Sequence, residues 1–146
     1  MADPAVWPLY DAGIEDDLIV VTHSGQSRDG TGRGTPDSFR PLLEAKPDLR
    51  IVLAHMGGQA WSQVPALARD YPQVTFDLCE IVEWLGASDA PTAAEFADVL
   101  QQVGTDRIMM GSDFPWYDIQ HTVKVVQEVP GLSDLDHDRI LGLNAA

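Results

Sequence analysis

The chain has 146 residues, of which 45% are apolar and 22% charged, a composition typical of one globular domain, residues 1–146. Nine basic against 23 acidic residues give a formal net charge of −14, which opposes binding to nucleic acid or to an anionic membrane surface. The single cysteine, Cys79, and the absence of basic residues from the first twenty positions argue against a disulfide framework and a signal peptide. No apolar run approaches the ~20 residues of a membrane span, so we expect a cytoplasmic protein.

Helical and strand patterns alternate along the chain. Apolar residues at roughly helical spacing predict a helix over residues 4–14, before a strand over 18–22. The Gly-rich residues 24–35 predict a mobile loop beside a site, because no Gly-Lys-Ser/Thr follows them as in a phosphate-binding loop. Arg28 and Arg33 in this loop either contact an anionic substrate or are solvated. Further strands are predicted over 50–54, 74–78 and 107–111, and further helices over 37–45, 61–71, 92–103, 119–129 and 134–145.

Three of the predicted strands, over 18–22, 50–54 and 107–111, contain short runs that are aliphatic on both faces and bounded by Gly, Pro or charged residues, a pattern typical of buried parallel strands. The four predicted strands end near residues 22, 54, 78 and 111, and the intervals of 32, 24 and 33 residues suit a strand plus a crossover helix. The pattern therefore predicts an α/β fold with four parallel strands.

Three of these strands run into side chains that can bind a metal or transfer a proton: His23, His55 and Asp113. Each residue alone is weak evidence for a functional site, since a histidine or carboxylate near a strand is more often structural. In parallel sheets, however, function gathers at the carboxyl ends of the strands. Two imidazoles and a carboxylate there suit zinc or a similar divalent cation.

Other residues near the strand ends are weaker candidates. Glu80 either faces the same pocket or is an ordinary loop carboxylate, and Cys79 is expected to be a buried small apolar residue. His121 and His137 are expected to be structural and exposed, respectively. The tryptophans at 61, 84 and 116 either wall a hydrophobic substrate pocket or pack beneath loops.

Several segments resemble, in the correct order, the carboxyl-terminal half of the amidohydrolase-related TIM-barrel metal-dependent hydrolases, a family that includes aminocarboxymuconate-semialdehyde-type decarboxylases. The most specific pieces are His-Met-Gly-Gly at 55–58 and Gly-Ser-Asp-Phe-Pro at 111–115. The resemblance implies half of a (β/α)8 barrel, strands five to eight, at residues 3–25, 47–58, 71–78 and 104–116, with a closing helix at 139–145.

By this resemblance, His23 ligates a metal, and Asp113 ligates it or takes a proton from metal-bound water. His55 polarises the substrate or, in some members, binds the metal. The implied cofactor is a divalent cation, zinc or alternatively manganese. The implied reaction is hydrolysis of an amide, ester or lactone of a small molecule by metal-activated water. The alternative within this site design is non-oxidative decarboxylation of an aromatic or unsaturated acid.

The chain departs from the family in one respect, because the His-x-His pair of the first barrel strand is absent. A complete barrel typically needs ~250 residues. We therefore expect a truncated piece with a missing amino-terminal half-barrel, or a homo-oligomer in which two copies assemble. A catalytically silent fragment is the third interpretation.

Overall fold

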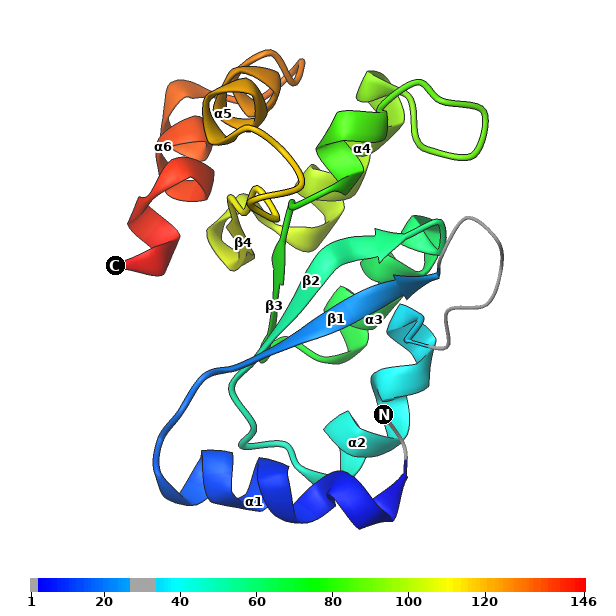
Figure 1. Ribbon diagram of the computed structural model, residues 1–146, viewed down its shortest axis with the longest axis vertical. Coiled ribbons are helices and arrows are strands. Elements are labelled where there is room, and N and C mark those ends of the chain that lie inside the picture. The colour runs from blue at the N-terminus through cyan, green and yellow to red at the C-terminus, as the bar shows by residue number, and fades with distance from the viewer. Residues whose placement is uncertain (1–2, 27–33) are drawn as a thin grey trace.

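The computed structural model describes residues 3–26 and 34–146 (Figure 1). Most of the Gly-rich segment, with Arg28 and Arg33, lies outside these residues, so the expectations for it stay predictions. Within the described ranges, the helices all lack the length or the apolar character needed to cross a bilayer.

Four parallel strands form one sheet in which each strand pairs with the next along the chain. Because parallel neighbours cannot be joined by a tight turn, each connection must cross over the sheet, and helices occupy the crossovers. The predicted fold class is therefore confirmed. The strands are β1 (Val20–Gln26), β2 (Ile51–Gly58), β3 (Val74–Asp77) and β4 (Ile108–Met109).

The helices agree with the sequence pattern, and several of them begin or end with a short 3₁₀ turn. α6 contacts β4 and α5, and α3 contacts α4 (Figure 1). The elements are η1 (Pro4–Val6), α1 (Trp7–Glu15), η2 (Pro36–Phe39), α2 (Arg40–Ala45), η3 (Trp61–Gln63), α3 (Val64–Asp70), η4 (Ile81–Trp84), α4 (Ala93–Val103), η5 (Thr105–Arg107), α5 (Ile119–Gln127), α6 (Asp134–Leu141) and η6 (Leu143–Ala145).

Local hydrogen bonds explain where α4 and α6 begin. The Thr92 side chain accepts from the Glu95 amide at the start of α4, and the Glu95 carboxylate accepts from the Thr92 amide in return. Ser133 and Asp136 form the same capping box at the start of α6. Each box satisfies two amides that the first helical turn leaves unpaired.

The two faces of the sheet differ. One face packs against the helices and contributes Ile51, Leu53, Val74, Phe76 and Ile108 to the hydrophobic core. Along each strand these residues alternate with residues on the other face, because successive side chains point to opposite sides of the sheet. The core is completed from the helices by residues such as Leu42, Leu43, Leu67, Phe96 and Leu100.

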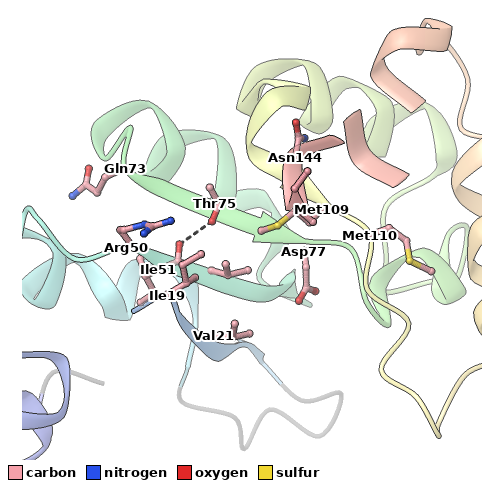
Figure 2. Close-up of a pocket in the computed structure, with 13 residues that line it drawn as sticks. Ile19, Val21, Arg50, Ile51, Gln73, Thr75, Asp77, Met109, Met110 and Asn144 are labelled. Atoms are coloured by element: carbon pink, nitrogen blue, oxygen red, sulfur yellow. Dashed lines mark hydrogen bonds between the residues drawn. The ribbon is translucent and has the colours of Figure 1, made fainter. Parts of the chain in front are cut away.

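The opposite face is open, and in the half-barrel that the resemblance implies it would be the inner face. Strand register aligns Val21 with Val52, and Val52 with Thr75, across three strands. A hollow of about 540 Å³ lies over this face, lined by Val21, Thr75, Asp77 and Met109 among others (Figure 2). Val21 is 65% exposed, which is unusual for a β-branched residue on a parallel strand.

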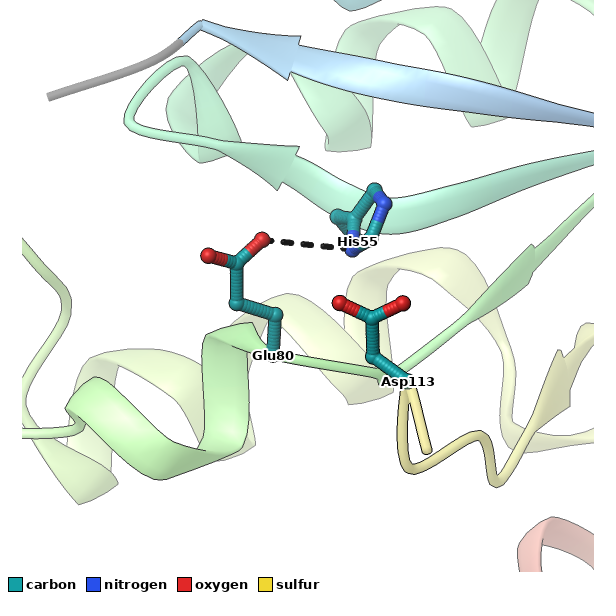
Figure 3. A group of neighbouring side chains, drawn as sticks. All are labelled: His55, Glu80 and Asp113. Atoms are coloured by element: carbon teal, nitrogen blue, oxygen red, sulfur yellow. Dashed lines mark ion pairs between the residues drawn. The ribbon is translucent and has the colours of Figure 1, made fainter. Parts of the chain in front are cut away.

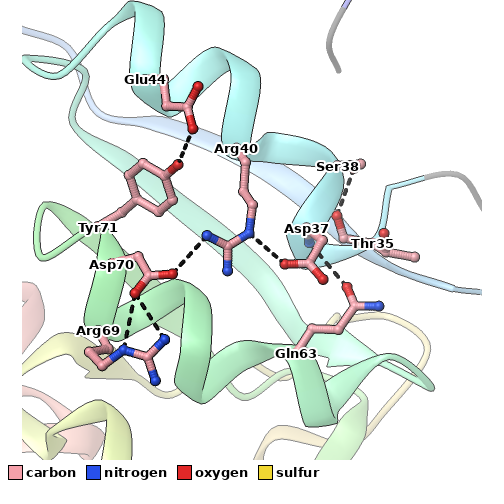
Figure 4. Close-up of polar contacts among 9 residues, drawn as sticks. All are labelled: Thr35, Asp37, Ser38, Arg40, Glu44, Gln63, Arg69, Asp70 and Tyr71. Atoms are coloured by element: carbon pink, nitrogen blue, oxygen red, sulfur yellow. Dashed lines mark hydrogen bonds and ion pairs between the residues drawn. The ribbon is translucent and has the colours of Figure 1, made fainter.

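A polar cluster ties α2 to α3 on the outer surface (Figure 4). The Arg40 guanidinium donates to Asp37 at 2.7 Å and to Asp70 at 2.8 Å, and it lies over the Tyr71 ring. Arg40 lowers the pKa of Asp70 because it hydrogen-bonds to the charged carboxylate. The cluster is peripheral, so it contributes to stability rather than to the site.

The strand boundaries correct one expectation. We expected β1 and β2 to end before their histidines, but β1 runs to Gln26 and β2 to Gly58, so His23 and His55 lie within strands. The pairing of β1 with β2 extends past the histidines: the register shifts between His23 and Gly25, and Gly25 then pairs with Gly57. β4, in contrast, ends earlier than predicted, at Met109.

Candidate metal centre

Three side chains from three chain segments converge at the carboxyl ends of the strands. His55 lies in β2, Glu80 follows β3 and Asp113 follows β4 (Figure 3). Each offers one ligand atom, and these three atoms lie within 4.8 Å of one another. Glu80 Oε2 is 3.4 Å from His55 Nδ1. The structure therefore brings together two of the three residues singled out from the sequence, together with the weaker candidate Glu80.

All three residues of this group have positive φ angles: 69° at His55, 65° at Glu80 and 55° at Asp113. Non-glycine residues rarely adopt this backbone conformation, which costs on the order of 1–3 kcal/mol per residue. Such strain is concentrated at functional sites, where the surrounding structure holds it in place.

The strain at Glu80 has a defined form. Its φ and ψ angles are 65° and −52°, and the Ile81 amide donates to the Cys79 carbonyl at 2.7 Å. This is the positive-φ γ-turn, which is rare and strained. The turn directs the Glu80 side chain toward His55, as Figure 3 shows. No hydrophobic period or sequence motif signals such a turn.

His23 lies beside this group without belonging to it. Its ring centroid is 4.7 Å from that of His55, with the two planes tilted by 58°. The His23 side chain is exposed, whereas His55 is 9% exposed. The two imidazoles predicted to share a cavity mouth are therefore neighbours.

The imidazole of His55 is held by residues that the sequence did not mark as functional. The Cys79 sulfur lies 3.2 Å from His55 Nδ1 and donates to Asp77 Oδ1 at 2.6 Å. Cys79 is buried as expected, and burial first, then the neighbouring Asp77 carboxylate, raises the pKa of its thiol. An unpaired anionic nucleophile is therefore disfavoured at this position.

A hollow of about 310 Å³ opens beside the carboxylates, lined by Glu80, Asp113, Trp116 and Tyr117. The Trp116 ring is 80% exposed, an uncommon position for so large an apolar side chain. Burial raises the pKa of Tyr117, while a hydrogen bond from the Trp84 indole lowers it. Of the tryptophans considered either as pocket walls or as packing residues, Trp116 lines this hollow, and Trp84 hydrogen-bonds to Tyr117. Trp61 instead lines a different hollow, between α3 and α4.

The remaining histidines lie on helices. His121 Nε2 is 3.1 Å from Glu83 Oε2, and the nearly buried Glu83 also accepts from the Thr122 hydroxyl at 2.6 Å. This links η4 to α5, as a structural histidine should. His137, expected at the surface, is half-buried.

The donor set fits a divalent cation. Two carboxylates and one imidazole nitrogen are ligands that zinc and manganese both accept, and their ligand atoms are close enough to share one ion. Carboxylates at this spacing would otherwise repel each other in a partly buried position, which a cation relieves.

Comparison with known proteins gives the same fold. The family model for amidohydrolases matches residues 2–146. No curated protein matches the chain. Among solved structures, an uncharacterised TIM-barrel protein from Bordetella bronchiseptica is similar, with 19% identity and a TM-score of 0.78 over 99% of this chain and 50% of its own.

Two further structures carry metals. An amidohydrolase from Burkholderia multivorans with bound zinc is 19% identical, with a TM-score of 0.73 over 99% of this chain and 56% of that one. A dihydroxybenzoic acid decarboxylase from Polaromonas with bound manganese and the inhibitor 2-nitroresorcinol is 15% identical, with a TM-score of 0.69 over 99% and 53%. The chain spans about half the length of each of these proteins. Because the family model covers almost every residue, the chain belongs to the amidohydrolase family.

Proposed function

We propose that this chain carries half of the active site of a metal-dependent hydrolase, in which metal-activated water attacks an amide, ester or lactone. The observation that carries the proposal is the convergence of His55, Glu80 and Asp113, all in strained backbone conformations, at one end of a parallel sheet. The zinc in the Burkholderia amidohydrolase supports the same choice of cofactor.

Each residue has a role that its chemistry allows. Asp113 and a histidine nitrogen, from His23 or His55, would hold the cation, with Glu80 in reach of the same ion. The bound cation would supply a water of lowered pKa. A carboxylate of the group, Asp113 in the first instance, would take a proton from that water, and the His55 ring, when it carries a proton on Nε2, would polarise the substrate oxygen.

Decarboxylation of an aromatic acid is the second candidate. The observation that favours it is the exposed Trp116 ring, which lines the hollow next to Glu80 and Asp113 and offers a planar apolar surface. The Polaromonas decarboxylase of the same fold binds an aromatic inhibitor. In this reaction a protonated His55 imidazolium would give its Nε2 proton to the carbon from which carbon dioxide departs, and would become neutral.

The experiment compares metal content and turnover. We expect the purified chain, dialysed and analysed by mass spectrometry, to hold zinc or manganese, and the His23→Ala/Asp113→Ala double variant to lose it. Asp98→Ala, on the exposed face of α4, is the matched control and should keep the metal. Ester and lactone hydrolysis and carbon dioxide release from aromatic acids then separate the two reactions. A metal-free, inactive wild type would favour a catalytically silent fragment.

The open face of the sheet supports a further part of the proposal, that a second half-barrel covers it. Ile19 and Val21 are 54% and 65% exposed on this face, and β1 and β4 each have one unpaired edge in the described sheet. An amino-terminal half-barrel or another copy of the chain would supply the missing strands. The expected cytoplasmic location stays a prediction.

A further inference from the structure

A single carboxylate oxygen at the end of β3 supports His55. Asp77 Oδ1 accepts from the His55 amide at 3.1 Å, from the Cys79 amide at 3.0 Å and from the Cys79 thiol at 2.6 Å. The first of these bonds joins β3 to β2 at the residue whose φ is 69°. Asp77 therefore helps to hold the strained backbone from which the His55 ring projects.

The Cys79 thiol contacts both Asp77 and the His55 ring, so it links the carboxylate to the imidazole. Because a carboxylate can only accept, the proton in the 2.6 Å contact belongs to the Cys79 sulfur. The sulfur then faces His55 Nδ1, 3.2 Å away, with a lone pair. The other neighbour of Nδ1 is Glu80 Oε2 at 3.4 Å, which also presents a lone pair.

Two acceptors beside one ring nitrogen place the proton on that nitrogen, because in a neutral imidazole one nitrogen donates and the other accepts. We propose that Asp77 and Cys79 are positioning residues for His55, fixing its ring and placing its proton on Nδ1, so that Nε2 is the nitrogen with the lone pair. In Figure 3 the other ring nitrogen lies on the side turned away from Glu80. In this tautomer the neutral His55 ring binds a metal or accepts a hydrogen bond through Nε2, and it can donate to a substrate oxygen only when the ring is protonated.

The packing around this pair leaves little freedom. A Cβ atom added at Gly111 would lie 3.1 Å from Cys79 Cβ and 3.3 Å from Asp77 Cγ. The backbone after β4 therefore presses against both positioning residues and limits the conformations open to them.

Nitrogen-15 NMR of the histidine rings tests the inference on the full chain, with metal removed by a chelator and at a pH where His55 is neutral. His55→Gln identifies the His55 signals by their loss. We expect wild-type Nδ1 to show the shift of a protonated nitrogen and Nε2 that of an unprotonated one. In Cys79→Ala the two shifts should move toward each other, which marks a mixture of tautomers. Cys79→Ser, which keeps a donor and an acceptor, should restore the wild-type pattern.

The inference is wrong if wild-type His55 carries its proton on Nε2 or is already a mixture, or if Cys79→Ala leaves both shifts unchanged. Failure of Cys79→Ser to restore the pattern would also count against it. Thermal unfolding by circular dichroism establishes that each variant is folded, and the wild-type spectrum alone decides the tautomer if a variant is not. The role of this tautomer in catalysis rests on the proposed function. The tautomer itself is measured without metal or turnover, so the tautomer proposal and the proposed function can fail separately.

Discussion

The carboxylate of Glu80 reaches the imidazole of His55 from a γ-turn whose positive φ angle a glycine would adopt without strain. A charged side chain at this point is therefore retained at a cost to stability. Since Asp113 also has a positive φ angle, the placement of these two side chains comes at a cost in stability.

Replacing Glu80 separates the strain from the charge. Glu80→Gly and Glu80→Ala both remove the carboxylate, but only glycine relieves the positive φ angle. We expect Glu80→Gly to be more stable than Glu80→Ala by about 1 kcal/mol or more in urea unfolding. Both variants should lose metal affinity to the same extent. Equal stability of the two would show that the turn is not strained.

Gly111 gives a second test of the packing around the site. The side chain of Gly111→Ala would meet Cys79 and Asp77 at distances that require both to shift. We expect this variant to lose about 1–3 kcal/mol of unfolding free energy, as is usual for overpacking. Gly142→Ala is the matched control, because a Cβ there meets nothing within 4 Å. A loss of similar size in both variants would contradict the account.

Acid should weaken the anchor of α6. Hydrogen bonds from Thr105 and Ser133 lower the pKa of Asp136 from 3.8 to about 2. Because the folded pKa lies below the unfolded one, the stability that this carboxylate contributes is present above about pH 4 and is lost as the pH falls toward 2. The difference in unfolding free energy between wild type and Asp136→Asn should therefore shrink across this range. A difference that stays constant with pH would sink the prediction.

The open sheet face predicts association of the isolated chain. We expect light scattering after size-exclusion chromatography to find dimers or larger species, and Val21→Asn to shift them toward monomer by weakening apolar contact on this face. Leu9→Asn, at an exposed position on α1, is the control and should leave the association unchanged. A wild-type chain that is monomeric and unfolds cooperatively would argue against a covering half-barrel.

The order of the strands and the identity of most helices could be predicted from the sequence. Apolar runs such as residues 51–54 are short and aliphatic with polar residues on both sides, and sequential βα units leave few topologies open. Strand ends were less predictable, because pairing after His23 and His55 depends on glycines of neighbouring strands rather than on apolar residues.

The site was predictable only in part, for physical reasons. His55 and Asp113 follow apolar runs, which the sequence displays. Glu80 depends on a γ-turn that uses no distinctive residue pattern, so its side-chain direction could not be foreseen. The support from Asp77 requires a contact between neighbouring strands at a particular register, which local sequence does not encode.

The Asp77 oxygen that holds His55 belongs, with both of its partners, to the adjacent strands β2 and β3 and the loop that follows them. The residues that orient this histidine therefore lie in one continuous segment of the chain. In a chimera that joins these residues to the complementary half of a different barrel, the imidazole should keep its orientation. The added half would then need to supply only the other side of the site.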